Sequence, residues 1–188
     1  MTAPTHITIG IAASIFTASH FSILLNPVGF ITLLIGALLP DVDGGGVITR
    51  PGTILKRFLN RPMILLLDFF GASVSEVSRK VTGHRGFFHW LIWPILIIGY
   101  ARKFSISWLF WLGLGYLTHV MADALTPLGV PLLAPFSTKK ISLLGIRTGS
   151  FLEFVVFILT LLYSIFASWE LLPEGVREAF SKLMTELR

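Results

Sequence analysis

The chain has 188 residues, of which 54% are hydrophobic and only 13% are charged, and its mean hydropathy is +0.79. A soluble globular domain carries roughly 25% charged residues, so this composition indicates an integral membrane protein of one domain rather than a soluble protein. The net charge of +5 is typical of basic loops beside a membrane, and the absence of cysteine excludes disulfides and thiolate metal ligands.

The first part of the chain contains two apolar runs and a polar, Gly-rich segment. Ile7–Leu25 predicts a first span, which the turn signal Asn26-Pro27 ends. Val28–Leu39 predicts a second, short span, because a dozen residues at about 1.5 Å each do not cross a ~30 Å hydrocarbon core. Met63–Val74 is apolar but is interrupted by an aspartate, so we expect a re-entrant or interfacial helix there.

The second part of the chain predicts three more spans, at Phe87–Ala101, Trp108–Leu125 and Phe151–Trp169. The tail from Pro173 to Arg188 has apolar residues at helical spacing, which predicts an amphipathic surface helix. The expected fold is all-α: a polytopic membrane bundle of about five spans over residues 1–172, with the re-entrant or interfacial helix, and a tail helix over 173–188.

Alternating spans bring eight polar residues to one side of the bilayer: His6, Asp41, Asp43, His84, His89, His119, Asp123 and Glu153. This arrangement requires that Met63–Val74 does not cross. His20 falls in mid-span or near the opposite side, and we interpret it as a packing or hydrogen-bonding residue. Ten of the 15 Lys and Arg residues lie on the side of the cluster, the others being Arg102, Lys103, Arg177, Lys182 and Arg188. The positive-inside rule therefore predicts that the cluster faces the cytoplasm.

His119 and Asp123 have the i, i+4 spacing that places an imidazole and a carboxylate on one helix face. Two such side chains can share one metal ion, although a helix-end His–Asp hydrogen bond is the simpler alternative. Charged groups inside apolar spans are costly, which favours a functional role.

Asp41 and Asp43 follow a proline in Leu-Pro-Asp-Val-Asp. Two carboxylates at this spacing repel each other unless a cation lies between them, and such a pair can bind or bridge metal ions. The alternative is a polar turn before the glycine run that follows.

His84 and His89 flank Arg85 in Gly-His-Arg-Gly-Phe-Phe-His, with His84 expected in a loop and His89 in the first turn of a span. Arg85 is suited to bidentate binding of a phosphate or carboxylate. An interfacial aromatic belt with His and Arg at the headgroups is the alternative, and it explains the aromatic residues better than the paired histidines.

Three further residues have weaker signals. His6 would be interpreted as a surface histidine if it stood alone. Glu153 lies three residues after Ser150, so it suits a capping box as well as a site role. Arg147 can bind an anion or simply mark a cytoplasmic loop. No nucleophile motif and no Walker-type phosphate loop is present.

The number of candidate ligands exceeds the three protein ligands and one water of a catalytic zinc, which suggests two or more ions. Sites with several ions and His/Asp ligands suit phosphoester hydrolysis, because the ions activate water and neutralise phosphate charge.

These motifs together resemble the YdjM-type, LexA-regulated, membrane-bound metal-dependent hydrolases of bacteria and archaea. The resemblance spans roughly residues 1–155 and rests on His6, the segments 39–43, 83–89 and 115–130, Pro135-Phe136 and the Gly-Ser-x-x-Glu that ends at Glu153. It implies a metal-dependent hydrolase of the inner membrane without naming a substrate. The His119-x-x-x-Asp123 pair is also similar to that of zinc-dependent phospholipase C and the P1-type nucleases, which are helical enzymes with three-zinc sites.

The sequence therefore predicts a zinc phosphoesterase, of the phospholipase or lipid-phosphate phosphatase type, that acts on a lipid or membrane-delivered substrate and not on nucleic acid. We expect His6, Asp41, His84, His89, His119 and Asp123 to hold the ions, with Mn²⁺ or Mg²⁺ as alternatives to zinc. Asp43 or Glu153 would bridge ions or act as the base, and Arg85 with Arg147 would bind the phosphate. A divalent-metal transporter and a non-catalytic membrane protein with a structural metal are the alternatives.

Overall fold

The computed structural model describes residues 1–21, 23–44, 85–170 and 174–186, and these parts of the chain are mostly helical. In chain order the helices are α1 (Ala3–Phe21), α2 (Pro27–Leu38), η1 (Leu39–Gly44), η3 (Phe87–His89), α5 (Ile92–Lys103), α6 (Ser107–Ala124), α7 (Phe151–Glu170) and α8 (Glu174–Glu186). Within these residues, β pairing is limited to one antiparallel bridge between Val130 and Ile141. The predicted all-α class is confirmed.

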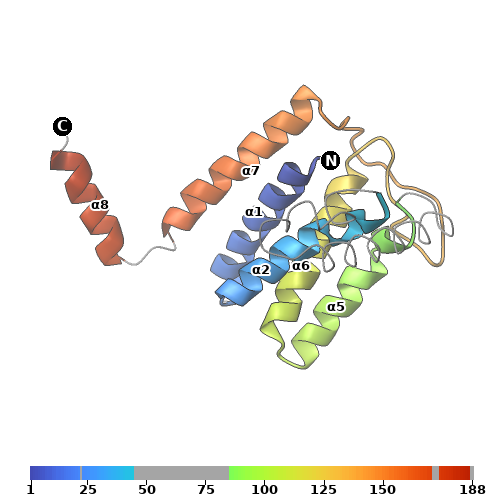
Figure 1. The fold of residues 1–188 in the computed structure, drawn as a ribbon, viewed down its shortest axis with the longest axis horizontal. Helices are drawn as coiled ribbons and strands as arrows, with labels where there is room; N and C mark the ends of the chain where they lie inside the picture. The colour runs from blue at the N-terminus through green and yellow to red at the C-terminus, as the bar shows by residue number, and fades with distance from the viewer. Residues whose placement is uncertain (22, 45–84, 171–173, 187–188) are drawn as a thin grey trace, which may run out of the picture.

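Helix α6 lies at the centre of the bundle, where it packs against α1, α2 and α5, while α1 also packs against α7 (Figure 1). Helix α8 lies apart from the bundle, beyond the end of α7, and Phe180 contacts Trp169 of α7 edge to face at 5.1 Å between ring centroids. The carboxyl end of α6 and the amino end of α1 meet at the same end of the bundle, which is where the polar residues gather.

Helices α2 and α6 approach each other so closely that two glycines have no room for a side chain. A Cβ at Gly36 would collide with the carbonyl oxygen of Leu112, and a Cβ at Gly115 would collide with that of Leu33. Small residues allow this close backbone approach between membrane helices. The contact fixes the position of α2 relative to the face of α6 that carries His119.

The helix boundaries follow from local sequence. Asn26 caps α2 by accepting a hydrogen bond from the Gly29 amide at 2.7 Å, and Pro27 occupies the first helical position, where its missing N–H costs nothing. Ser150 caps α7 by accepting from the Glu153 amide at 3.3 Å.

The third predicted span begins later than expected. Phe87–His89 forms a short 3-10 helix, Trp90 is extended (φ −74°, ψ 130°), and α5 begins only at Ile92, so His89 precedes the helix instead of lying in its first turn. The Trp93 indole donates to the Phe87 carbonyl at 2.9 Å, which stabilises this bend. The predicted re-entrant or interfacial helix at Met63–Val74 lies outside the described residues.

Many apolar side chains of the bundle are exposed, as expected for a surface in contact with lipid. On α7 they include Phe151, Leu152, Phe154, Leu159, Ile165 and Phe166. Among the described helices, one stretch, Phe151–Trp169, is both long and apolar enough to cross a membrane. Helices α2 and α5, with 12 residues each, are about 18 Å long. The predicted number of five spans stays a prediction.

Candidate metal centre

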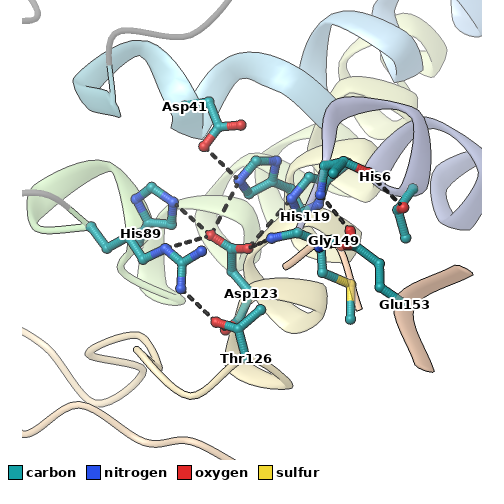
Figure 2. Close-up of polar contacts among 12 residues, drawn as sticks. His6, Asp41, His89, His119, Asp123, Thr126, Gly149 and Glu153 are labelled. Carbon is teal, nitrogen blue, oxygen red and sulfur yellow. Dashed lines mark hydrogen bonds and ion pairs between the residues drawn. The ribbon is translucent and has the colours of Figure 1, made fainter. Parts of the chain in front are cut away.

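Asp123, in the last turn of α6, lies at the centre of a buried group of histidines (Figure 2). Its Oδ2 atom is 3.4 Å from Nε2 of His89 and 3.8 Å from Nε2 of His119, and its Oδ1 atom is 3.4 Å from Nε2 of His6. All four side chains are almost completely buried. Residues from α1, α6 and η3 therefore converge on one carboxylate.

The orientation of His119 is set by helix α2. Nδ1 of His119 is 2.7 Å from the carbonyl oxygen of Ala37, and because a carbonyl only accepts, Nδ1 must carry the proton. In the neutral ring Nε2 then presents a lone pair, and it lies 3.5 Å from Oδ1 of Asp41. Histidines that bind metals usually have this outer hydrogen bond to a carbonyl or carboxylate.

Asp41 lies in η1 and is the more exposed carboxylate of the centre, with 30% of its side chain accessible. Burial disfavours the charge of Asp41, but the neighbouring imidazole of His119 holds its pKa below the ordinary value. Asp41 is therefore ionised at neutral pH and available to a cation.

His6 is 1% exposed, and neither of its ring nitrogens has a hydrogen-bond partner among the residues that the structure describes. Its ring stacks on that of His119 with the centroids 3.8 Å apart and the planes within 9°. Buried polar atoms without partners are costly, so such atoms in a native site call for a missing ligand. Among the described residues, Nε2 of His119 also has no hydrogen-bond partner.

The donor atoms fit a metal ion. One ligand atom from each of Asp41, His89, His119 and Asp123 lies within 4.8 Å of all the others. Donor atoms around one tetrahedral zinc lie about 3.3 Å apart, given bond lengths of ~2.0–2.1 Å. Three of the distances between these side chains, 3.4 to 3.8 Å, are close to that value. The nitrogen and oxygen donors suit Zn²⁺ and equally other borderline divalent ions.

Two cationic groups also contact Asp123. Nε of Arg85 is 2.9 Å from Oδ2, and the amino group of Met1 is 2.7 Å from Oδ1. Nη1 of Arg85 donates to Oγ1 of Thr126 at 2.5 Å, and Thr126 in turn donates to the carbonyl of Asp123 at 2.8 Å. Arg85 has a positive φ of 58°, an uncommon conformation that often occurs at functional sites. Positive charge is thus already directed at the buried carboxylate.

Glu153 binds backbone amides instead of the histidines. Its Oε1 accepts from the Thr2 amide at 2.5 Å, and its Oε2 accepts from the Gly149 amide at 2.6 Å (Figure 2). The carboxylate therefore joins the start of α1 to the loop before α7. Its contact with Gly149 lies next to the Ser150 cap, but its contact with Thr2 does not belong to a capping box. Arg147 is exposed on this loop.

The remaining predicted residues are placed as follows. His84 and the side chain of Asp43 lie outside the described residues. His20 is fourteen residues from His6 along α1, about 21 Å away, and Nδ1 of its ring is 3.0 Å from the Phe16 carbonyl. Sequence reasoning missed the roles of the Ala37 carbonyl and of Thr126, although the position of Thr126 three residues after Asp123 was a usable signal.

The sequence matches the family of the YdjM inner membrane protein over residues 1–179. The chain belongs to this family. Two curated relatives, both described as inner membrane protein YdjM, come from Escherichia coli (strain K12) and Shigella flexneri. Each is 30% identical over 128 residues, which cover 62% of this chain and 65% of the relative, so the chain spans just under two thirds of their length. No solved structure matches the chain.

This match confirms the predicted resemblance to the YdjM family, and the metal-dependent hydrolase activity that the resemblance implies stays a prediction. It also supports an inner membrane location, in agreement with the exposed apolar side chains of α7.

Proposed function

We propose that this chain is a membrane-bound, metal-dependent hydrolase, and specifically a zinc phosphoesterase. The observation that carries the proposal is the convergence of three buried histidines on Asp123 with Arg85 beside them. Among the described residues, both ring nitrogens of His6 and Nε2 of His119 have no hydrogen-bond partner. A structural histidine cluster would satisfy its ring nitrogens with hydrogen bonds, whereas a metal centre keeps them available.

Asp41, His89, His119 and Asp123 would hold a zinc ion. His6, whose Nε2 lies 3.4 Å from Oδ1 of Asp123, would be a ligand of a second ion. A bound zinc supplies a water of lowered pKa and polarises a phosphoryl oxygen. The Ala37 carbonyl keeps the proton of His119 on Nδ1, so that Nε2 stays free to bind. Asp41 marks the side open to substrate, because the other three side chains are buried.

Arg85 would bind the phosphate of the substrate. Its guanidinium is held near the centre by Thr126 and Asp123, and an arginine fork suits two phosphate oxygens. A cation held by Asp123 would offset the negative charge that Arg85 contacts, so the guanidinium would be available to the phosphate. Glu153 is a poor choice for the base, because both of its oxygens accept hydrogen bonds from backbone amides.

The proposed substrate is a lipid or lipid-linked phosphate ester. The centre lies at the amino ends of α1 and α7 and the carboxyl end of α6, beside helices whose apolar side chains are exposed. A lipid headgroup therefore reaches it without leaving the membrane surface. We further propose about five spans, with the centre on the cytoplasmic side, as the distribution of basic residues predicts.

The test is to purify the full chain in detergent, measure bound metal by mass spectrometry, and assay phosphate release from phosphatidic acid and headgroup release from phosphatidylglycerol. We expect at least one zinc per chain and metal-dependent cleavage of a phosphate ester. Asp123→Asn, which keeps the size of the side chain, should lose both. His20→Ala serves as the matched control and should keep both.

Metal-free wild-type protein, or full activity of Asp123→Asn, would refute the proposal. A protein that binds zinc but cleaves no phosphate ester is to be tested for zinc uptake in proteoliposomes, since uptake would identify the transporter alternative. Retention of zinc with neither activity would indicate a structural metal.

A further inference from the structure

Helix α5 carries a glycine for which the bundle gives no packing reason. Gly29, Gly36, Gly113 and Gly115 all face a neighbouring helix so closely that a Cβ would collide with it. Gly99, in the middle of α5, has none of the described residues within 4 Å of the position of its Cβ. Glycine inside a helix costs about 0.5–1 kcal/mol relative to alanine, so the open space above Gly99 requires another explanation.

This open space belongs to a shallow groove on the outside of the bundle. The groove has a volume of about 710 Å³ and runs along α5, with Trp93, Leu96, Gly99, Tyr100 and Lys103 among its lining residues and Leu109 of α6 at its side. From Trp93 to Lys103 it covers about 15 Å of helix, which is half of a ~30 Å hydrocarbon core. Its walls are almost entirely apolar, so it suits one acyl chain.

The two ends of the groove differ in chemistry. At the carboxyl end of α5, Arg102 and Lys103 are exposed, and Tyr100 and Trp108 beside them are about half exposed. Aromatic residues next to basic residues are typical of the membrane–water interface, and lysine there attracts anionic headgroups. At the other end Trp93 closes the groove against Phe87 and Trp90.

We propose that this groove binds one anionic phospholipid, with its headgroup at Arg102 and Lys103 and one acyl chain over Gly99. Because α5 runs from η3 to Lys103, the headgroup lies at the end of the bundle opposite to the candidate metal centre. The groove is therefore a lipid site in the leaflet away from the centre and is distinct from the site at which the substrate would bind.

The experiment is native mass spectrometry of the full chain, purified in detergent and incubated with phosphatidylglycerol or, separately, with phosphatidylcholine. We expect the wild-type chain to retain one phosphatidylglycerol at least fivefold more than phosphatidylcholine. Gly99→Leu, which fills the groove, and Lys103→Glu, which reverses the charge at its end, should each reduce this retention at least fivefold.

Two matched variants control for general effects. Ser168→Leu enlarges an exposed position on α7, and Lys139→Glu reverses an exposed charge in the loop before α7, so both should leave retention unchanged. Equal retention of the two lipids, or loss in the controls as large as in the groove variants, overturns the proposal. A dimer that Gly99→Leu abolishes without any change in bound lipid also overturns it, since a second copy would then occupy the groove.

Melting temperatures give an independent measurement that does not require a lipid to survive in the mass spectrometer. Gly99→Ala should raise the melting temperature in detergent, because alanine favours the helix and meets no neighbour. It should also reduce the additional rise that phosphatidylglycerol produces. A rise on adding lipid that is the same in wild type and Gly99→Leu contradicts the proposal.

Discussion

The rings of His6 and His119 stack at 3.8 Å between their centroids, although the two residues are 113 positions apart in the chain. Two protonated imidazoles at this distance in a buried site would repel strongly, so at least one ring is neutral. Neutral imidazole is the form that binds metals. The stack therefore favours the same protonation state that a metal centre requires.

His6→Ala should lower the zinc content of the purified protein, since it removes a buried ring nitrogen that contacts Asp123. The expected loss of affinity for at least one zinc is ~10–100-fold or more. Zinc content after dialysis against a weak chelator measures it. His20→Ala, on the same helix, should behave as wild type, and an equal loss in both variants would refute a specific role of His6.

Thr126→Val should weaken substrate binding, because the valine side chain has the same shape but cannot accept the hydrogen bond of Arg85. A hydrogen bond to a charged group contributes about 1.5–3 kcal/mol, so KM for a phosphate ester should rise roughly tenfold or more. Thr126→Ser keeps the hydroxyl and should restore KM. Zinc content should stay unchanged in both variants, and a loss of zinc would show that Thr126 supports the centre itself.

Glu153→Ala should destabilise the protein by about 1–3 kcal/mol, because the amides of Thr2 and Gly149 lose the acceptor of two partly buried hydrogen bonds. Thermal unfolding in detergent measures the change, and Glu153→Gln, which keeps one acceptor oxygen, should lose less. If Glu153 were a metal ligand instead, Glu153→Gln would lose zinc at unchanged stability.

Gly115→Ala should cost about 1–3 kcal/mol of stability, since the added methyl group collides with the backbone of α2. Displacement of α2 also moves the Ala37 carbonyl that orients His119, so zinc affinity should fall as well. Gly99→Ala is the control, because nothing lies near the added methyl group there. Equal stability of Gly115→Ala and wild type would contradict the close packing.

The sequence was sufficient to predict that His6, Asp41, His89, His119 and Asp123 lie together. Each stands at the end of an apolar run, and the predicted alternation of spans places those ends on one side. The i, i+4 spacing of His119 and Asp123 added a common helix face. The same reasoning placed His20 elsewhere, because it lies at the far end of α1.

Other features depend on contacts that no pattern in one sequence reveals. The start of α5 at Ile92 follows from the bend at Trp90, and the apolar run gave no sign of it. The partner of His119 is a backbone carbonyl, which any residue at position 37 would provide. Glu153 had two equally reasonable roles, and only the positions of Thr2 and Gly149 distinguish them.

The reciprocal contacts of Gly36 and Gly115 with opposite backbones have a genetic consequence. A collision between two side chains can be relieved by a smaller partner, but the atoms that meet a Cβ at these positions are carbonyl oxygens, which every residue carries. Suppressor screens of Gly115→Ala should therefore return glycine at position 115, and compensating changes at Leu33 should not be found.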